Sequence, residues 1–92
     1  MTFEILDPVD FLTNGMFMEE AFLTKADSYD WSRFAGKKVL VRGCTAAIIP
    51  PWVFMYFTGK LTPFAQSVRY GNEHDNVVVF RVPREKKQTE EN

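Results

Sequence analysis

One stretch of the sequence, residues 39–61, constrains the fold most strongly, because it predicts a strand, a loop and a helix in succession. Residues 38–42 read Lys-Val-Leu-Val-Arg, an apolar and largely β-branched run that stops at Gly43. Pro50 and Pro51 suit the start of a helix, since its first positions have no intrahelical partner for the missing N–H groups. The apolar residues that follow the two prolines form the predicted helix body.

Three more strands and a second helix complete the predicted fold. Residues 2–6 alternate and end before Pro8, residues 66–70 and 77–82 flank a polar turn, and residues 16–26 show helical spacing. Because a helix joins the strands of residues 38–42 and 66–70, these strands should be parallel and linked by a right-handed crossover. We therefore expect an α/β fold: a small mixed sheet of three to four strands, helices packed on it and a C-terminal β-hairpin.

The length of 92 residues predicts one domain, which we place at residues 1–83. Residues 84–92 form a mixed-sign polar run that we expect to be a disordered tail, because it has too little apolar surface to bury. The chain nevertheless carries nine Phe, two Trp, three Tyr and four Met. This excess of large apolar side chains in so short a chain indicates apolar surface left for a partner.

Charge and hydropathy argue against several classes of function. A formal net charge of −1 gives no electrostatic footprint for nucleic acid or for an anionic membrane surface. The longest apolar run, residues 46–57, contains two prolines and is too short to cross a membrane. No export signal is expected at the N-terminus, where Asp7 and Asp10 interrupt any apolar run. The single cysteine fits a reducing cytoplasm, so we expect a cytoplasmic protein.

Cys44 and His74 are the candidates for catalysis. Cys44 follows a predicted core strand and precedes a helix, which is where open α/β sheets place ligand sites. A thiol there could act as a nucleophile, a sulfur carrier or a metal ligand, or it could simply be a small buried side chain that closes the strand. His74 lies in a polar turn, where a solvated imidazole is expected, yet a parallel crossover puts both loops at the same edge of the sheet.

Phosphate chemistry and metal binding are disfavoured. Pro50 and Pro51 remove two N–H donors from the place where a phosphate would bind, and the loop lacks the glycines of a nucleotide-binding motif. No arginine stands five or six residues beyond Cys44, as cysteine phosphatases require. One Cys, one His and scattered carboxylates at no recognised spacing do not make a metal site, so no metal and no cofactor are expected.

The helix that begins at Pro50 and runs to Leu61 is the predicted binding element. Its first turns are apolar around the whole circumference, which predicts burial on all sides, either by another chain or by the N-terminal segment of this one. The predicted binding residues are Cys44, Thr45, Pro50, Pro51, Trp52 and Tyr56. A small-ligand pocket beneath the loop of residues 45–49 is a weaker possibility.

Several short motifs resemble a bacterial domain family of unknown function, over roughly residues 19–71. The matching residues are Asp30-Trp31-Ser32, Gly36-Lys37, Cys44, Ala47-Ile48-Ile49-Pro50, Trp52, Met55, Leu61, Pro63 and the run of residues 68–71. The chain departs from the family at Ala46, where an acidic-flanked pattern is common, and in its short N-terminal extension. The resemblance implies a shared fold and a shared loop, with no established activity. An association of some members with iron–sulfur assembly would give Cys44 a role.

Two functional hypotheses follow. The first is a non-enzymatic interaction module that forms a homo-oligomer or binds a protein partner through the helix of residues 50–61. Its support is the surplus of aromatic residues and the lack of a catalytic constellation. The second is a thiol-dependent factor for sulfur or iron–sulfur handling, in which Cys44 carries the reactive sulfur and His74 assists.

Overall fold

The protein is built on a four-stranded mixed sheet in which the strands follow one another in chain order. The computed structural model describes residues 2–43 and 48–83. The strands are β1 (Glu4–Leu6), β2 (Lys38–Arg42), β3 (Ser67–Gly71) and β4 (Asn76–Arg81). The pairs β1–β2 and β2–β3 are parallel, and β3–β4 is antiparallel. The predicted α/β fold, with its mixed sheet and C-terminal hairpin, is therefore confirmed.

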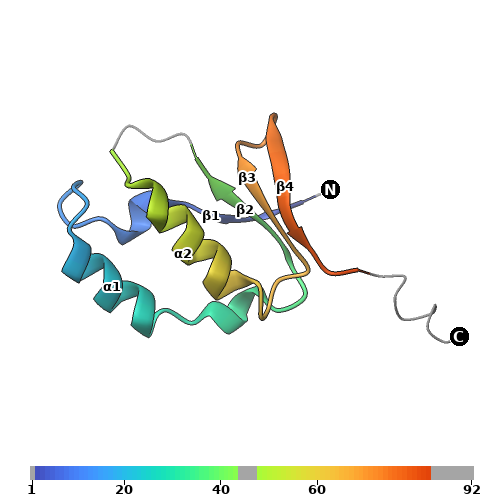
Figure 1. Ribbon diagram of the computed structural model, residues 1–92, viewed down its shortest axis with the longest axis horizontal. Helices are drawn as coiled ribbons and strands as arrows, with labels where there is room; N and C mark the ends of the chain where they lie inside the picture. The colour runs from blue at the N-terminus through green and yellow to red at the C-terminus, as the bar shows by residue number, and fades with distance from the viewer. Residues whose placement is uncertain (1, 44–47, 84–92) are drawn as a thin grey trace, which may run out of the picture.

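Two α-helices and two short 3-10 helices lie on one face of this sheet (Figure 1). They are η1 (Pro8–Phe11), α1 (Glu19–Ser28), η2 (Trp31–Phe34) and α2 (Pro51–Leu61). The carboxylates of Asp7 and Asp30 cap the two 3-10 helices by accepting hydrogen bonds from backbone N–H groups. Pro51 occupies the first position of α2, as the sequence predicts.

The core lies between α2 and the sheet. Helix α2 buries Val53, Phe57 and Leu61, which are spaced four residues apart and so share one face. From the sheet side, Leu6, Val39, Val41 and Val68 complete the buried cluster. These strand residues are two positions apart or are register partners, so they all point to the helical face.

Aromatic side chains fill the space between α2, α1 and the 3-10 helices. Phe57 is fully buried, and its ring centroid lies 5.0 Å from that of Phe11, 5.7 Å from that of Phe22 and 5.9 Å from that of Trp31. The indole Nε1 of Trp31 donates a hydrogen bond of 2.9 Å to the carbonyl of Ala26 at the end of α1. The aromatic residues therefore join α1, η1 and η2 to the core.

Among residues 2–43 and 48–83, no helix lies on the opposite face of the sheet, which is covered by side chains of the strands and of Phe3. Leu40 is fully buried there, apart from the main cluster. Arg69, its partner across β2–β3, places its guanidinium 5.7 Å from the ring centroid of Phe3 and donates to Asn76 Oδ1 at 2.8 Å. Successive β3 residues alternate faces, so Tyr70, next to Arg69, points to the helical side.

Within the single chain α2 is not buried on all sides, and cover by another chain stays a prediction. Met55 is 76% exposed, and Pro51 and Gly59 are exposed as well. The other predicted alternative was cover by the N-terminal segment. That segment covers one side of the helix, where Phe17 and Phe22 pack against Trp52. Within one chain, a helix in a two-layer domain buries only the stripe that faces the sheet and its neighbour helix.

Some predicted features lie outside the described residues. Cys44 and Thr45, together with the polar tail of residues 84–92, are among them. Within the described ranges, no helix has the length and apolar character needed to cross a membrane.

Candidate functional site

The carboxyl ends of the parallel strands form one edge of the sheet. The backbone N–H of Gly43, which directly follows β2, donates a 3.0 Å hydrogen bond to the carbonyl of Gly71, the last residue of β3. The segment after β2 therefore starts beside the β3–β4 turn. This is the arrangement that the sequence predicts for two parallel strands joined by a helix.

An ion-pair cluster ties this edge together. Arg42, at the end of β2, pairs with Glu73 in the β3–β4 turn and, at 3.4 Å, with Asp7 after β1. The hydrogen bond and the charge of Glu73 are the main causes that raise the pKa of Arg42, with a smaller contribution from Asp7. In turn, the hydrogen bond from Arg42 lowers the pKa of Glu73. The cluster is partly exposed, and its contacts align three strand ends.

His74 lies in the exposed part of the β3–β4 turn. Its backbone N–H, like that of Asp75, donates a 2.8 Å hydrogen bond to Oδ1 of Asn72. The turn therefore holds the His74 backbone in place, while the imidazole lies on the surface. Because Cys44 is outside the described residues, a Cys44–His74 pair stays a prediction.

Tyr70 is the side chain at this edge that the sequence analysis missed. An alanine Cβ at Gly43 would lie 2.5 Å from Cζ and 2.7 Å from the hydroxyl oxygen of Tyr70. The phenol therefore lies directly against the Gly43 backbone, and a side chain there has no room. The ring also contacts Phe54 of α2, with the centroids 5.1 Å apart. Tyr70 thus spans the distance between α2 and the end of β2.

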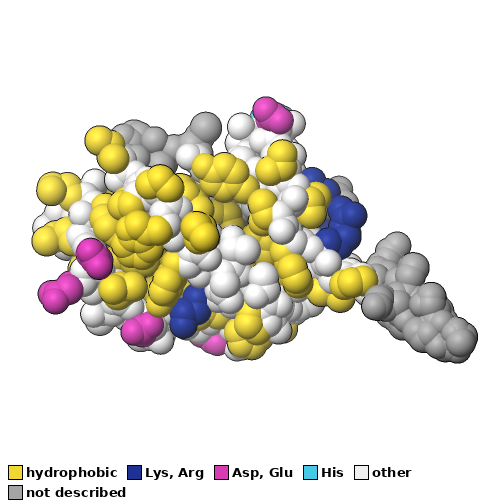
Figure 2. Space-filling model, in the orientation of Figure 1, with side chains coloured by type: hydrophobic (Ala, Val, Ile, Leu, Met, Phe, Trp, Pro, Cys, Tyr) yellow, Lys and Arg dark blue, Asp and Glu magenta, His cyan; other side chains and the backbone are white. Residues whose placement is uncertain are grey.

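An apolar groove runs between α2 and the β3–β4 hairpin. Its volume is about 470 Å³, which is within the range of ligand and peptide sites. Its lining includes Val41, Phe54, Met55, Val68, Tyr70 and Val79. Yellow side chains border it on both sides in Figure 2, from α2 on one side and from the hairpin on the other. The polar side chains in the lining are few, so the groove suits an apolar surface rather than a polar metabolite.

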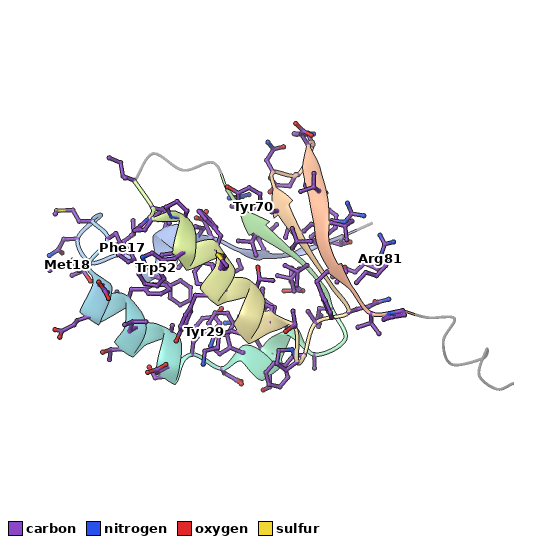
Figure 3. All side chains as sticks on the ribbon, in the orientation of Figure 1. Phe17, Met18, Tyr29, Trp52, Tyr70 and Arg81 are labelled. Carbon is purple, nitrogen blue, oxygen red and sulfur yellow. The ribbon has the colours of Figure 1, made fainter. Side chains whose placement is uncertain are left out.

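The predicted binding residues of α2 do not share one surface. Pro51 lines the groove. Trp52 and Tyr56 turn toward α1, where both rings lie within 6 Å of the Phe22 ring centroid, at 5.6 and 5.4 Å. Figure 3 shows Trp52 beside Phe17, on the far side of α2 from Tyr70. Of these three predicted residues, Pro51 lies at the groove and the other two at the contact with α1.

Tyr56 has a structural role at the α1–α2 contact. Its hydroxyl donates a 3.1 Å hydrogen bond to Oδ1 of Asp27. Burial, followed by the interaction with Asp27, raises the pKa of this phenol. A tyrosine with a raised pKa stays protonated at neutral pH, so this group fixes the two helices and offers no base.

The groove residues that the sequence analysis missed had a weak signal. Phe54 and Met55 fall between the core positions Val53 and Phe57, and Tyr70 stands two residues after Val68 on the same strand face. No group of three or more His, Cys, Asp or Glu side chains within residues 2–43 and 48–83 could hold a metal ion.

The fold defines the structural class of the chain, and its sequence defines the family. The chain is a two-layer α/β domain, with a mixed sheet, helices on one face and an apolar groove beside the last hairpin. Residues 1–86 match the family described as "Protein of unknown function (DUF2480)", and the chain belongs to that family. The expected membership of a family without an assigned function is thereby confirmed. No curated protein and no solved structure matches the chain.

Proposed function

We propose that this domain is a non-enzymatic interaction module, and that the groove between α2 and the β3–β4 hairpin receives a polypeptide partner. One observation carries the proposal: large apolar side chains on both walls of the groove face solvent. Met55 is 76% exposed on the helix wall, and Val79 is 49% exposed on the hairpin wall. Single exposed apolar residues are ordinary on protein surfaces, but several that line one groove indicate an interaction site.

The chemistry of the groove supports a partner rather than a substrate. Its floor is formed by Val41 and Val68, and the one phenol at its end, Tyr70, is held between Phe54 and the Gly43 backbone. Burial of a partner's apolar area against such a lining is favourable, and the lining offers few groups for acid–base catalysis. Methionine adapts its shape to varied contacts, which suits the exposed position of Met55.

Photo-crosslinking inside cells tests this proposal. A benzoylphenylalanine introduced at position 55 should form covalent adducts with another polypeptide, either a second copy or a different chain. The matched control is the same group at position 20, where Glu20 is exposed on α1, away from the groove. The proposal fails if position 55 yields no more adduct than position 20.

A second candidate is the thiol role predicted for Cys44. The observation that favours it is the hydrogen bond from Gly43 to Gly71. Through this bond Gly43, the residue before Cys44, lies beside the turn that contains His74. In this hypothesis, Cys44 reacts with iodoacetamide at neutral pH at least about tenfold faster than free cysteine. A native-state rate at or below that of free cysteine, with no change on His74→Ala, would rule the role out.

A further inference from the structure

We propose that the partner is a second copy of this chain, which adds to the free edge of β4 so that the two β4 strands run antiparallel. This inference rests on the proposed interaction role. It identifies the polypeptide that binds at the groove side of the sheet. It is carried by three features: the open edge of β4, the charges at its two ends, and the exposed valines between them.

The first feature is the open edge. Strand β4 ends the sheet order and pairs only with β3, so its other side presents backbone N–H and C=O groups that no neighbouring strand of the described sheet engages. It spans six residues, Asn76–Arg81, and contains no proline or lysine to prevent pairing. Residues of high β propensity, Val77, Val78, Val79 and Phe80, form its centre.

The other edge of the sheet differs in each respect. Strand β1 spans only three residues, Glu4–Leu6, begins with a charge and is followed by Asp7 and Pro8. Short, charged edges closed by proline resist pairing with another chain. If one edge of this sheet accepts a second copy, it is therefore the β4 edge.

The second feature is the charge at the ends of β4. Asp75 precedes the strand and Arg81 is its last residue, and both are exposed. Neither takes part in an ion pair within residues 2–43 and 48–83. Figure 3 shows Arg81 at the end of β4, pointing away from the helices. An antiparallel pair brings Asp75 of each copy toward Arg81 of the other, whereas a parallel pair would place like charges together.

The third feature is the exposed apolar surface of the strand. Val77, Val78 and Val79 are 59%, 39% and 49% exposed, although strands of small domains usually bury one face. A two-fold axis perpendicular to the sheet keeps the helices of both copies on one face. The β4 side chains of one copy then extend the open wall of the groove in the other.

A break in the regular pairing of β4 with β3 limits the expected stability of the dimer. The register with β3 shifts between Val68 and Arg69, which leaves Val79 as an extra residue on β4. A bulge interrupts regular pairing on the outer side of the strand as well. The intermolecular ladder is therefore short, and we expect a reversible dimer whose population depends on protein concentration.

Sedimentation equilibrium and light scattering on the full chain test the inference. The mass should rise from 10.7 kDa toward twice that value as the concentration increases. The variants Asp75→Arg and Arg81→Asp should each weaken the dimer by about tenfold or more, because each turns two attractive contacts into repulsive ones. The double variant D75R/R81D should restore the wild-type mass profile, since the attraction is retained with its signs exchanged.

The control is Glu20→Arg, a charge reversal of the same size on α1, which should leave the mass profile unchanged. A wild-type chain that stays monomeric at millimolar concentration overturns the inference, and so does a dimer that both single reversals leave intact. Crosslinking at position 55 distinguishes the two proposals. Adducts with a different polypeptide from a monomeric chain refute the second copy and retain the interaction module, whereas no adducts refute the module itself.

Discussion

The two halves of this sheet are covered very differently, although they belong to one small domain. Over β1 and β2, the helices and 3-10 segments build a dense aromatic cluster in which Phe11, Phe22 and Phe57 touch one another. Over β3 and β4, the cover is one wall of α2, and the described residues make a single aromatic ring contact there, from Phe54 to Tyr70. We call these the packed half and the open half.

The difference shows how a short chain divides its apolar residues. In the part of the chain that the structure describes, two α-helices and two short 3-10 helices cover the four-stranded sheet unevenly. Here the N-terminal segment, α1 and η2 all lie against the same side of α2, which concentrates stability in the packed half. The open half is left with exposed apolar surface, and that surface is available for binding.

The largest effect should come from truncation in the packed half. We expect Phe57→Ala to lower the free energy of unfolding by about 3–5 kcal/mol, because the ring is fully buried among other rings and leaves a cavity. Urea denaturation measures the change. Met55→Ala on the same helix is the control, and we expect a change within about 0.5 kcal/mol because that side chain is 76% exposed. Equal losses for both variants would contradict the division into halves.

A smaller effect should come from the junction of the two halves. We expect Gly43→Ala to cost about 1–3 kcal/mol, because the new methyl group would lie 2.5 Å from Cζ of Tyr70. The φ angle of Gly43 is not positive, so the penalty is steric and not conformational. In a Tyr70→Ala background the same substitution should cost less than half as much, and a double-mutant cycle measures this coupling. Independent, additive costs would refute the contact.

The smallest effect should come from the ion pairs at the sheet edge. The hydrogen bond from Arg42 lowers the pKa of Glu73 below its unfolded value near 4.5. The stabilisation is therefore present above about pH 4.5 and is lost as the pH falls through the folded pKa. Wild type should exceed Glu73→Gln in stability at pH 7, and the difference should shrink toward pH 3. In an Arg42→Gln background this pH-dependent difference should be much smaller, because only a backbone hydrogen bond and the charge of His74 still lower the pKa of Glu73. An undiminished difference would exclude the pair as its main cause.

Much of the fold could be predicted because its signals are local. The β-branched residues of β2 and the prolines before α2 mark where these elements lie, and the prediction for β2 matches Lys38–Arg42 residue for residue. Parallel pairing of β2 with β3 follows from the intervening helix. The juxtaposition of the two strand ends was predictable for the same reason.

The proposed binding surface was less predictable because contacts between distant residues define it. Apolar residues surround the first turns of α2, so periodicity alone could not separate the side that meets α1 from the side that faces the groove. The contact of Tyr70 with Gly43 joins residues far apart in the chain, and the pairing of Arg42 with Glu73 and Asp7 joins three strand ends. No short-range pattern encodes these contacts.

The strand order has a consequence for how the protein is made. Because each strand lies beside the one that precedes it in the chain, the sheet can grow outward from its N-terminal edge as the polypeptide leaves the ribosome. No strand has to wait for a later one to be inserted between it and its neighbour. Strand β4 is synthesised last, so β3 is the exposed edge until β4 emerges. Only a short turn then separates β3 from its partner β4. Synthesis should therefore move only one edge of the growing sheet outward, while β1 stays the opposite edge throughout.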